Sequence, residues 1–172
     1  YSGPPQFVVI PSTTVQYADV GRVTLSANFA GSGAADAGLS LVGSDDFVAA
    51  PSSFAISDLT PAPIIAGANF AAKVTALNAA GQATPNFGRE AGPEGVTLAF
   101  ARRQPTGSGT SAGSFSGSLG GFSAGMATAS NLSWTEVGSG DLSAALKSGS
   151  YLGTGLNASG STGLAGAVGR FI

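Results

Sequence analysis

Apolar residues alternate with small or polar ones in short runs along most of this chain. In residues 69–78, every second position from Phe70 to Ala76 is apolar, so these side chains would lie on one face of a strand. Similar alternation or short apolar runs predict strands at residues 6–10, 13–27, 47–48, 54–56, 96–103, 114–119, 126–134, 141–147 and 167–172. No segment has a convincing helical period, and short strands separated by turn residues are typical of an antiparallel β-sandwich.

Small residues and proline mark the connections between these runs. Residues 31–43 are rich in glycine, alanine and serine and predict a loop. Residues 49–51 read Ala-Ala-Pro and predict a boundary between domains. Residues 84–87 predict at best a short segment at a sheet edge, because Pro85 cannot donate a ladder hydrogen bond.

One motif occurs twice in the chain. Residues 17–21 read Tyr-Ala-Asp-Val-Gly and residues 134–138 read Trp-Thr-Glu-Val-Gly. A Leu-Ser-Ala run follows each copy, at residues 25–27 and 142–144, and all matched positions lie 117 apart (134 minus 17). A repeat at domain-sized spacing predicts two copies of one β-domain.

Each copy of the motif predicts a corner between two strands. The aromatic residue would fill the core, and the acid two positions later would accept hydrogen bonds from turn amides. The glycine suits a backbone with positive φ or a close approach of another segment. The corner residues are Tyr17, Asp19, Gly21, Trp134, Glu136 and Gly138.

The two copies predict tandem Ig-like antiparallel β-sandwiches, of which the first is incomplete. Only 16 residues precede Tyr17, whereas 82 separate Pro51 from Trp134. We therefore expect residues 1–50 to be the C-terminal part of one Ig-like domain and residues 51–172 to be a complete one. This interpretation makes the chain a fragment of a longer protein.

Composition narrows the classes of function. Charged residues make up 9% of the chain and hydrophobic residues 43%, which is unlike a disordered segment. The net charge is −2 and the sequence has no run of lysine and arginine, so we expect no nucleic-acid partner. The longest nearly apolar run, residues 61–72, is too short to span a bilayer.

The residue types also limit the chemistry. The sequence has no histidine and no cysteine, which excludes a Ser-His-Asp triad, a cysteine nucleophile and the common zinc sites within this chain. Carboxylates remain, and Asp36, Asp45 and Asp46 are weak candidates for calcium ligands at a hinge between domains. Neighbouring acids in a loop are more often simply solvated, so we expect no cofactor, no metal and no enzymatic activity.

Several scattered motifs carry a resemblance to a known family. They are residues 17–21, 76–79 with Gly81, 84–87, 115–117, Phe122 with 125–128, 134–138, 151–153 and 169–172. Through them the chain resembles the C-terminal Ig-like region of the MshQ-like bacterial surface proteins, which are associated with mannose-sensitive haemagglutinin type IV pili. The Tyr-x-Asp-Val-Gly corner is also similar to Ig-like domains of invasin-type adhesins. The resemblance implies an extracellular location at the bacterial cell surface and transfers no catalytic or metal-binding residue.

Three functions fit these features. The first is a non-enzymatic spacer in a surface or pilus-associated protein, and the second is an adhesin domain that binds carbohydrate or a host surface through loop residues at one end of the sandwich. An exposed Tyr151 could stack on a sugar, but its neighbour Leu152 favours an ordinary strand position. The third is a filament subunit assembled by β-strand complementation, with Phe7, Val8, Val9 and Ile10 as the exchanged segment. The expected partners are therefore the rest of a parent chain or neighbouring subunits, paired through β-strands. Pilus components and surface glycans are further candidates.

Overall fold

Nine β-strands and one short 3-10 helix make up the part of the chain that the computed structural model describes, residues 14–163. The all-β fold class expected from the alternating pattern is confirmed. The elements in chain order are β1 (Gly21–Ala30), β2 (Ser40–Ala49), β3 (Ser53–Ser57), β4 (Phe70–Leu77), β5 (Val96–Gln104), β6 (Phe115–Ser116), β7 (Met126–Trp134), β8 (Ser139–Leu146), η1 (Tyr151–Gly153) and β9 (Ser159–Ser161).

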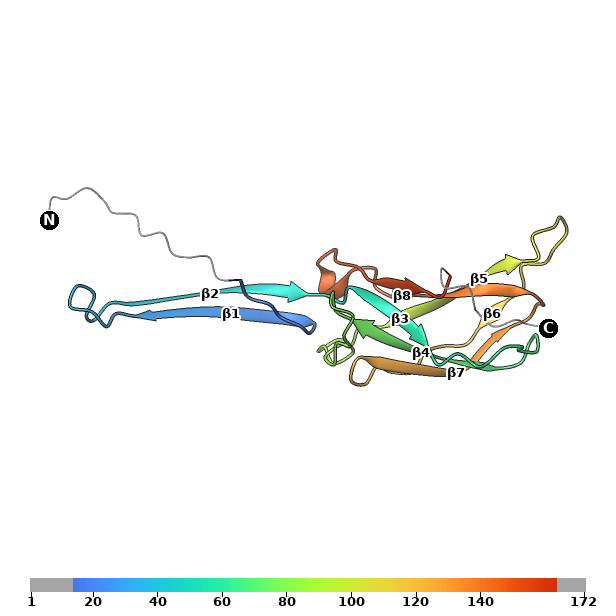
Figure 1. Cartoon of the computed structure of the whole chain (residues 1–172), viewed down its shortest axis with the longest axis horizontal. Coiled ribbons are helices and arrows are strands. Elements are labelled where there is room, and N and C mark those ends of the chain that lie inside the picture. Colours follow the sequence, from blue (N-terminus) through green and yellow to red (C-terminus); the bar gives the residue numbers. More distant parts are fainter. Residues whose placement is uncertain (1–13, 164–172) are drawn as a thin grey trace.

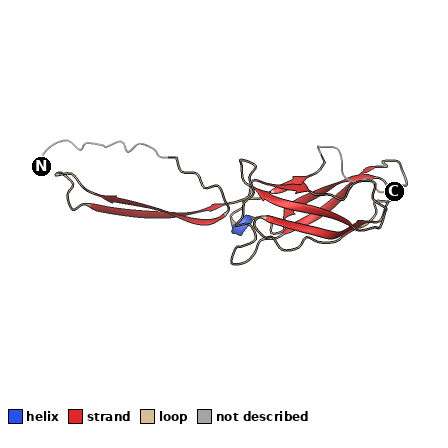
Figure 2. Ribbon diagram, turned by 60° about the horizontal axis from the view of Figure 1, so that its bottom comes forward, coloured by secondary structure: helices blue, strands red, loops and turns tan. Residues whose placement is uncertain are grey.

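Strands β3 to β9 form a β-sandwich, from one end of which β1 and β2 project as a long hairpin (Figures 1 and 2). One sheet has the order β3-β4-β7-β6 and the other has the order β5-β8-β9. All their pairings are antiparallel. This is the strand order of a seven-stranded constant-type immunoglobulin sandwich, in which one sheet is ABED and the other CFG.

The core lies between the two sheets, as the alternation predicts. Along β4, buried and half-buried residues alternate strictly, and Phe70 and Val74 point into the core. Leu142 and Leu146 face them from β8 in the opposite sheet. In strands such as β4, whose inner face is apolar and whose outer face carries threonine or lysine, the alternation therefore predicts which side is buried.

The hairpin differs from the sequence-based expectation. Residues 31–43 were expected to be a loop and residues 47–48 a short strand, but β2 begins at Ser40 and is ten residues long. It pairs with β1 from Gly21↔Ala49 to Ala30↔Ser40. The backbone N–H of Gly31 donates to the carbonyl of Leu39 over 2.8 Å and closes the turn. Cross-strand hydrogen bonds thus extend the ladder through small residues that have little strand propensity of their own.

Two further segments of the sandwich differ from expectation. Residues 84–87 are not an edge segment: they form a turn that buries Thr84 and Phe87, and the Phe87 ring centroid lies 5.4 Å from that of Phe54. Strand β9 reads Ser-Gly-Ser and has no apolar signal, so the alternating pattern missed it. The strand expected at residues 167–172 lies outside the described residues.

Candidate functional site: the hairpin and its junction with the sandwich

One face of the hairpin is apolar and exposed. The pairing register places alternate residues of β1 and β2 on this side, which we call the hairpin face. Its large members are Val23, Leu25, Phe29, Leu41 and Phe47. All but the half-buried Val23 are exposed, and Asp45, which pairs with Leu25, lies among them on the same side. An exposed row of large apolar side chains often marks an interaction surface.

The hairpin has the same strand register as the last hairpin of the sandwich. In β1 and β2 the pairs run Ser26↔Ser44, Ala27↔Gly43 and Asn28↔Val42. In β8 and β9 they run Ser143↔Ser161, Ala144↔Gly160 and Ala145↔Ser159. A shift of 117 positions converts each pair of the first hairpin into the corresponding pair of the second. The sequence repeat is therefore also a repeat of strand pairing.

The glycine of the repeated motif has the same backbone conformation in both copies. Gly21 has φ 130° and Gly138 has φ 133°, and each stands where the first strand of its hairpin begins. Such a φ strongly favours glycine. The local geometry of the corner therefore repeats together with the register.

The two hairpins differ in what covers them. Leu142 is 0% exposed within the sandwich core, whereas its counterpart Leu25 is 47% exposed. Leu146 is likewise buried, whereas its counterpart Phe29 is exposed. Equivalent positions therefore carry equivalent apolar side chains, but among the described residues only β8 has an opposing sheet to pack against.

The aromatic residues of the two corners have different surroundings. Trp134 is 1% exposed, its ring lies 4.7 Å from Phe100, and its Nε1–H donates to the Ala112 carbonyl over 3.2 Å. Tyr17 is 40% exposed, and its ring meets that of Phe47 edge-on at 6.5 Å. Within residues 14–163, Tyr17 therefore lies outside both buried core clusters.

The acids of the two corners also differ. Asp19 Oδ1 accepts hydrogen bonds from the backbone N–H groups of Val20 (2.8 Å) and Asn86 (3.2 Å). It therefore binds its own turn to a loop of the sandwich. Glu136 is half-buried beside the corner of the second copy.

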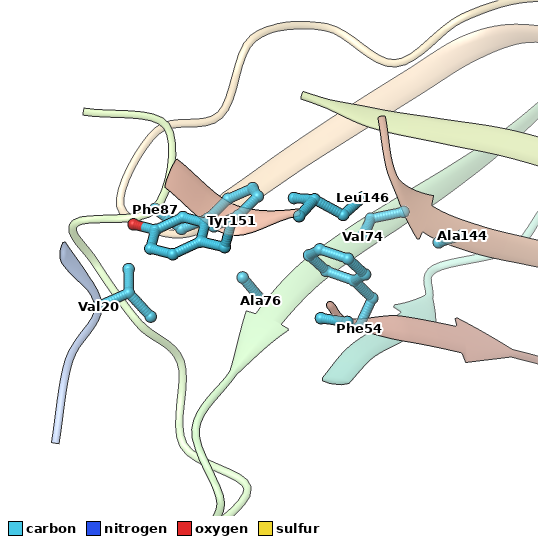
Figure 3. Packing of buried hydrophobic residues seen from close by; sticks show 9 residues of the cluster. Val20, Phe54, Val74, Ala76, Phe87, Ala144, Leu146 and Tyr151 are labelled. Carbon is cyan, nitrogen blue, oxygen red and sulfur yellow. The ribbon is translucent and has the colours of Figure 1, made fainter. Parts of the chain in front are cut away.

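Val20 anchors the hairpin to the sandwich. It is 1% exposed and packs into the cluster that contains Phe87 and Tyr151, as Figure 3 shows. Beside it, the side-chain Nδ2 of Asn78 donates to the carbonyl of Ala18 over 2.7 Å. The sequence repeat does not predict this anchoring role, because Val137, the counterpart of Val20, is 54% exposed.

The second strand of the hairpin enters the sandwich just as directly. Only residues 50–52 separate β2 from β3, Pro51 is buried, and Ser52 N–H donates to the Leu77 carbonyl over 2.8 Å. The partly buried Val48 and Ala50 pack against the same core cluster as Val20. The hairpin is thus held at both of its chain ends.

Two glutamates lie beneath this junction. The Tyr151 hydroxyl donates to Glu90 Oε1 over 2.7 Å, and Glu90 Oε2 accepts from the backbone of Gly88 and Glu94. Glu94 in turn accepts from the Leu152 N–H and the Ser148 hydroxyl. The carboxylates therefore organise a loop around η1. Tyr151 is fully buried, so it does not offer a ring to a sugar.

The buried phenol makes the free energy of unfolding depend on pH. Burial raises the pKa of Tyr151 far above its ordinary value, and the hydrogen bond to Glu90 raises it further. The unfolded chain loses this proton at about pH 10, whereas the folded chain keeps it, so the stabilisation falls as the pH rises above that value. Tyr151→Phe removes this contribution. We expect the stability difference between wild type and variant, measured by urea unfolding, to narrow between about pH 8.5 and about pH 10.5.

The structure does not bring the three calcium candidates together. Asp46 Oδ1 accepts from the Thr24 hydroxyl over 2.6 Å, and Asp45 Oδ1 accepts from the backbone of Asp46. Asp36 lies in the hairpin turn, where it accepts from Gly33 N–H. Within residues 14–163, no three acidic side chains are grouped so that they could hold a metal ion.

Two other expectations concern the membrane and strand exchange. Residues 14–163 contain no helix with the length and apolar character needed to cross a bilayer. The segment expected to exchange, Phe7 to Ile10, lies outside the described residues.

The strand order, the core and the exposed hairpin define an all-β sandwich protein. Its candidate site is the exposed face of the β1–β2 hairpin together with the open edge of β1. Residues 37–133 match the second domain of the DUF6701 family. Because the match spans more than half of the 172 residues, the chain belongs to this family. No curated protein and no solved structure matches the chain.

Proposed function

We propose that this chain is a non-enzymatic spacer module of a bacterial surface or pilus-associated protein, built from tandem Ig-like sandwiches. Residues 1–50 contribute the end of one sandwich and residues 51–172 form the next. The observation that carries the proposal is the strand register, which repeats at 117 positions. The resemblance to MshQ-like proteins supports the surface location, and labelling of intact cells with an antibody against the hairpin tests it.

The junction suits a spacer. Two chain crossings, the buried Val20 and the hydrogen bonds of Asp19 and Asn78 hold the hairpin in one orientation relative to the sandwich. A single flexible linker would let neighbouring domains move independently. A joint fixed at both ends instead transmits orientation from one domain to the next, which is what an extended stalk requires.

The chemistry of the junction also favours a structural role. An open cleft of about 450 Å³ lies at the base of the hairpin and is lined in part by Arg22, Arg89 and Glu90. Both oxygens of Glu90 already accept hydrogen bonds from the loop it organises. The sequence has no histidine or cysteine to serve as base or nucleophile beside it.

A filament subunit is the second candidate, because the hairpin has an exposed apolar face and an open strand edge. In that case a strand from a neighbouring molecule would complete the sheet. Self-association of the chain would distinguish this candidate from the spacer.

Val20→Asp tests the rigid joint. A buried charge without a partner is strongly disfavoured, so residue 20 should leave the core and free the hairpin on that side. We expect small-angle X-ray scattering to show one fixed elongated shape for the wild-type chain and a flexible two-part particle for the variant. Val137→Asp, at the exposed counterpart in the repeat, is the matched control and should scatter like wild type. A wild-type chain that is already flexible would contradict the spacer.

A further inference from the structure

We propose that the hairpin completes a preceding sandwich in a defined register. In this arrangement, a strand equivalent to β5 pairs antiparallel with the free edge of β1. A second strand, equivalent to β3, crosses closely over Gly43. The inference rests on the tandem arrangement proposed above and adds the partner, the edge and the points of contact.

The free edge of β1 has a paired counterpart in the sandwich. Among the described residues, β1 has a neighbour on one edge only, whereas β8 lies between β9 and β5. In β8, Leu142 pairs with Thr162 on the β9 side, since Thr162 N–H donates to the Leu142 carbonyl over 3.0 Å. The odd-numbered Lys147, just after β8, instead bonds on the β5 side, since its N–H donates to the Gly95 carbonyl over 2.8 Å. Successive residues of the strand therefore alternate between the two neighbours.

The same alternation applies to the hairpin. The N–H of Gly31 bonds to Leu39, so the odd-numbered residues of β1 bond towards β2. The backbone N–H and C=O groups of Thr24, Ser26 and Asn28 consequently point to the other edge. In the sandwich, the groups at the equivalent positions of β8 face β5.

Two glycines show where the missing strands pass. A Cβ atom on Gly160 would overlap the carbonyl oxygen of Phe54 in β3, so this glycine allows the opposing sheet to approach closely. Its counterpart Gly43 has no atom of residues 14–163 within 4 Å of its Cβ position and does not have a positive φ. A Cβ on Gly138 would overlap the Gln104 carbonyl at the end of β5, whereas the Cβ position of Gly21 meets no atom of the described residues. Within the part of the chain that the structure describes, the hairpin therefore has free space beside Gly43 and Gly21, where the sandwich has β3 beside Gly160 and the end of β5 beside Gly138.

The occupant is a sandwich segment that precedes the hairpin in the same polypeptide. In residues 51–163, the other five strands of the sandwich all come before β8 and β9 in the chain. The matched family region is itself described as a second domain. The strand at the free edge should alternate apolar and polar residues as β5 does, with its apolar side chains on the same side as the hairpin face.

Hydrogen exchange tests the proposed edge at single amides. In the full-length natural polypeptide, the N–H groups of Thr24, Ser26 and Asn28 should exchange at least about 100-fold more slowly than in the 172-residue chain. Mass spectrometry with electron-transfer fragmentation separates these amides from their neighbours. Equal exchange in the two proteins would overturn the proposal. The proposal would also be overturned if these amides exchanged slowly in the 172-residue chain and the exchange became slower still at higher protein concentration. A second copy of the chain would then cover the edge of β1.

Gly43→Val tests the close approach, with Ser44→Val as its matched control on the opposite face of the hairpin. In the full-length polypeptide, Gly43→Val should abolish the slow exchange, whereas Ser44→Val should retain it. In the 172-residue chain the two variants should be alike, since no atom of residues 14–163 lies within 4 Å of the Gly43 Cβ position. Slow exchange retained in both variants would overturn the docking geometry. The spacer proposal would still stand in that case if small-angle X-ray scattering showed a rigid joint between hairpin and sandwich. The spacer proposal and the docking proposal can therefore fail separately.

Discussion

Trp134→Ala is expected to lower the free energy of unfolding by about 3–5 kcal/mol, the usual cost of removing a buried aromatic side chain. The substitution leaves a cavity beside Phe100 and also removes the Nε1–H bond to Ala112. Trp134 is the only tryptophan of the chain, so the wild-type emission should be blue-shifted. Urea unfolding followed by circular dichroism measures the loss, because the variant has no tryptophan fluorescence.

Tyr17→Ala is the matched control at the other copy of the corner. Because Tyr17 is 40% exposed and lies outside both core clusters of the described residues, its removal should change the free energy of unfolding by only about 0.5 kcal/mol. Equal losses for the two variants would mean that the aromatic residues of both corners fill comparable cores in the chain. Wild-type emission like that of indole in water would contradict the burial of Trp134.

The sandwich could be predicted largely from its apolar alternation. Strands β4, β7 and β8 have a buried residue at nearly every second position, and β5 has a half-buried one, and this local signal agrees with the side of each strand that faces the opposite sheet. Segments whose burial depends on contacts with distant parts of the chain show no such alternation of apolar and polar residues. Phe87 follows a proline in a polar segment, yet it is buried among Phe54, Phe122 and Tyr151.

The hairpin shows a different limit of sequence analysis. The repeat identifies related corners, since register and glycine conformation depend on the local chain. Burial depends on which other strands are present, so the motif could not show that Trp134 is covered and Tyr17 is not. It also could not show that Val20 is buried while Val137 is exposed.

Gly160→Ala is the second substitution with a large expected effect. The added methyl group would overlap the backbone of Phe54, which cannot move without disturbing the pairing of β3 with β4. Forcing extra atoms into such a contact costs about 1–3 kcal/mol and sometimes more, and we expect the upper end because backbone yields less than a side chain. Chemical unfolding of the 172-residue chain measures the loss.

Gly43→Ala gives the comparison that links this effect to the missing strands. The same substitution at the equivalent register position meets no atom within 4 Å, so it should be neutral or stabilise the chain by less than about 1 kcal/mol. The contrast between the two variants follows from β3, which covers Gly160 and has no counterpart over Gly43 in residues 14–163. Similar losses for both variants would mean that Gly43 is already covered in the isolated chain. A neutral Gly160→Ala would mean that β3 does not approach β9 as closely as the structure places it.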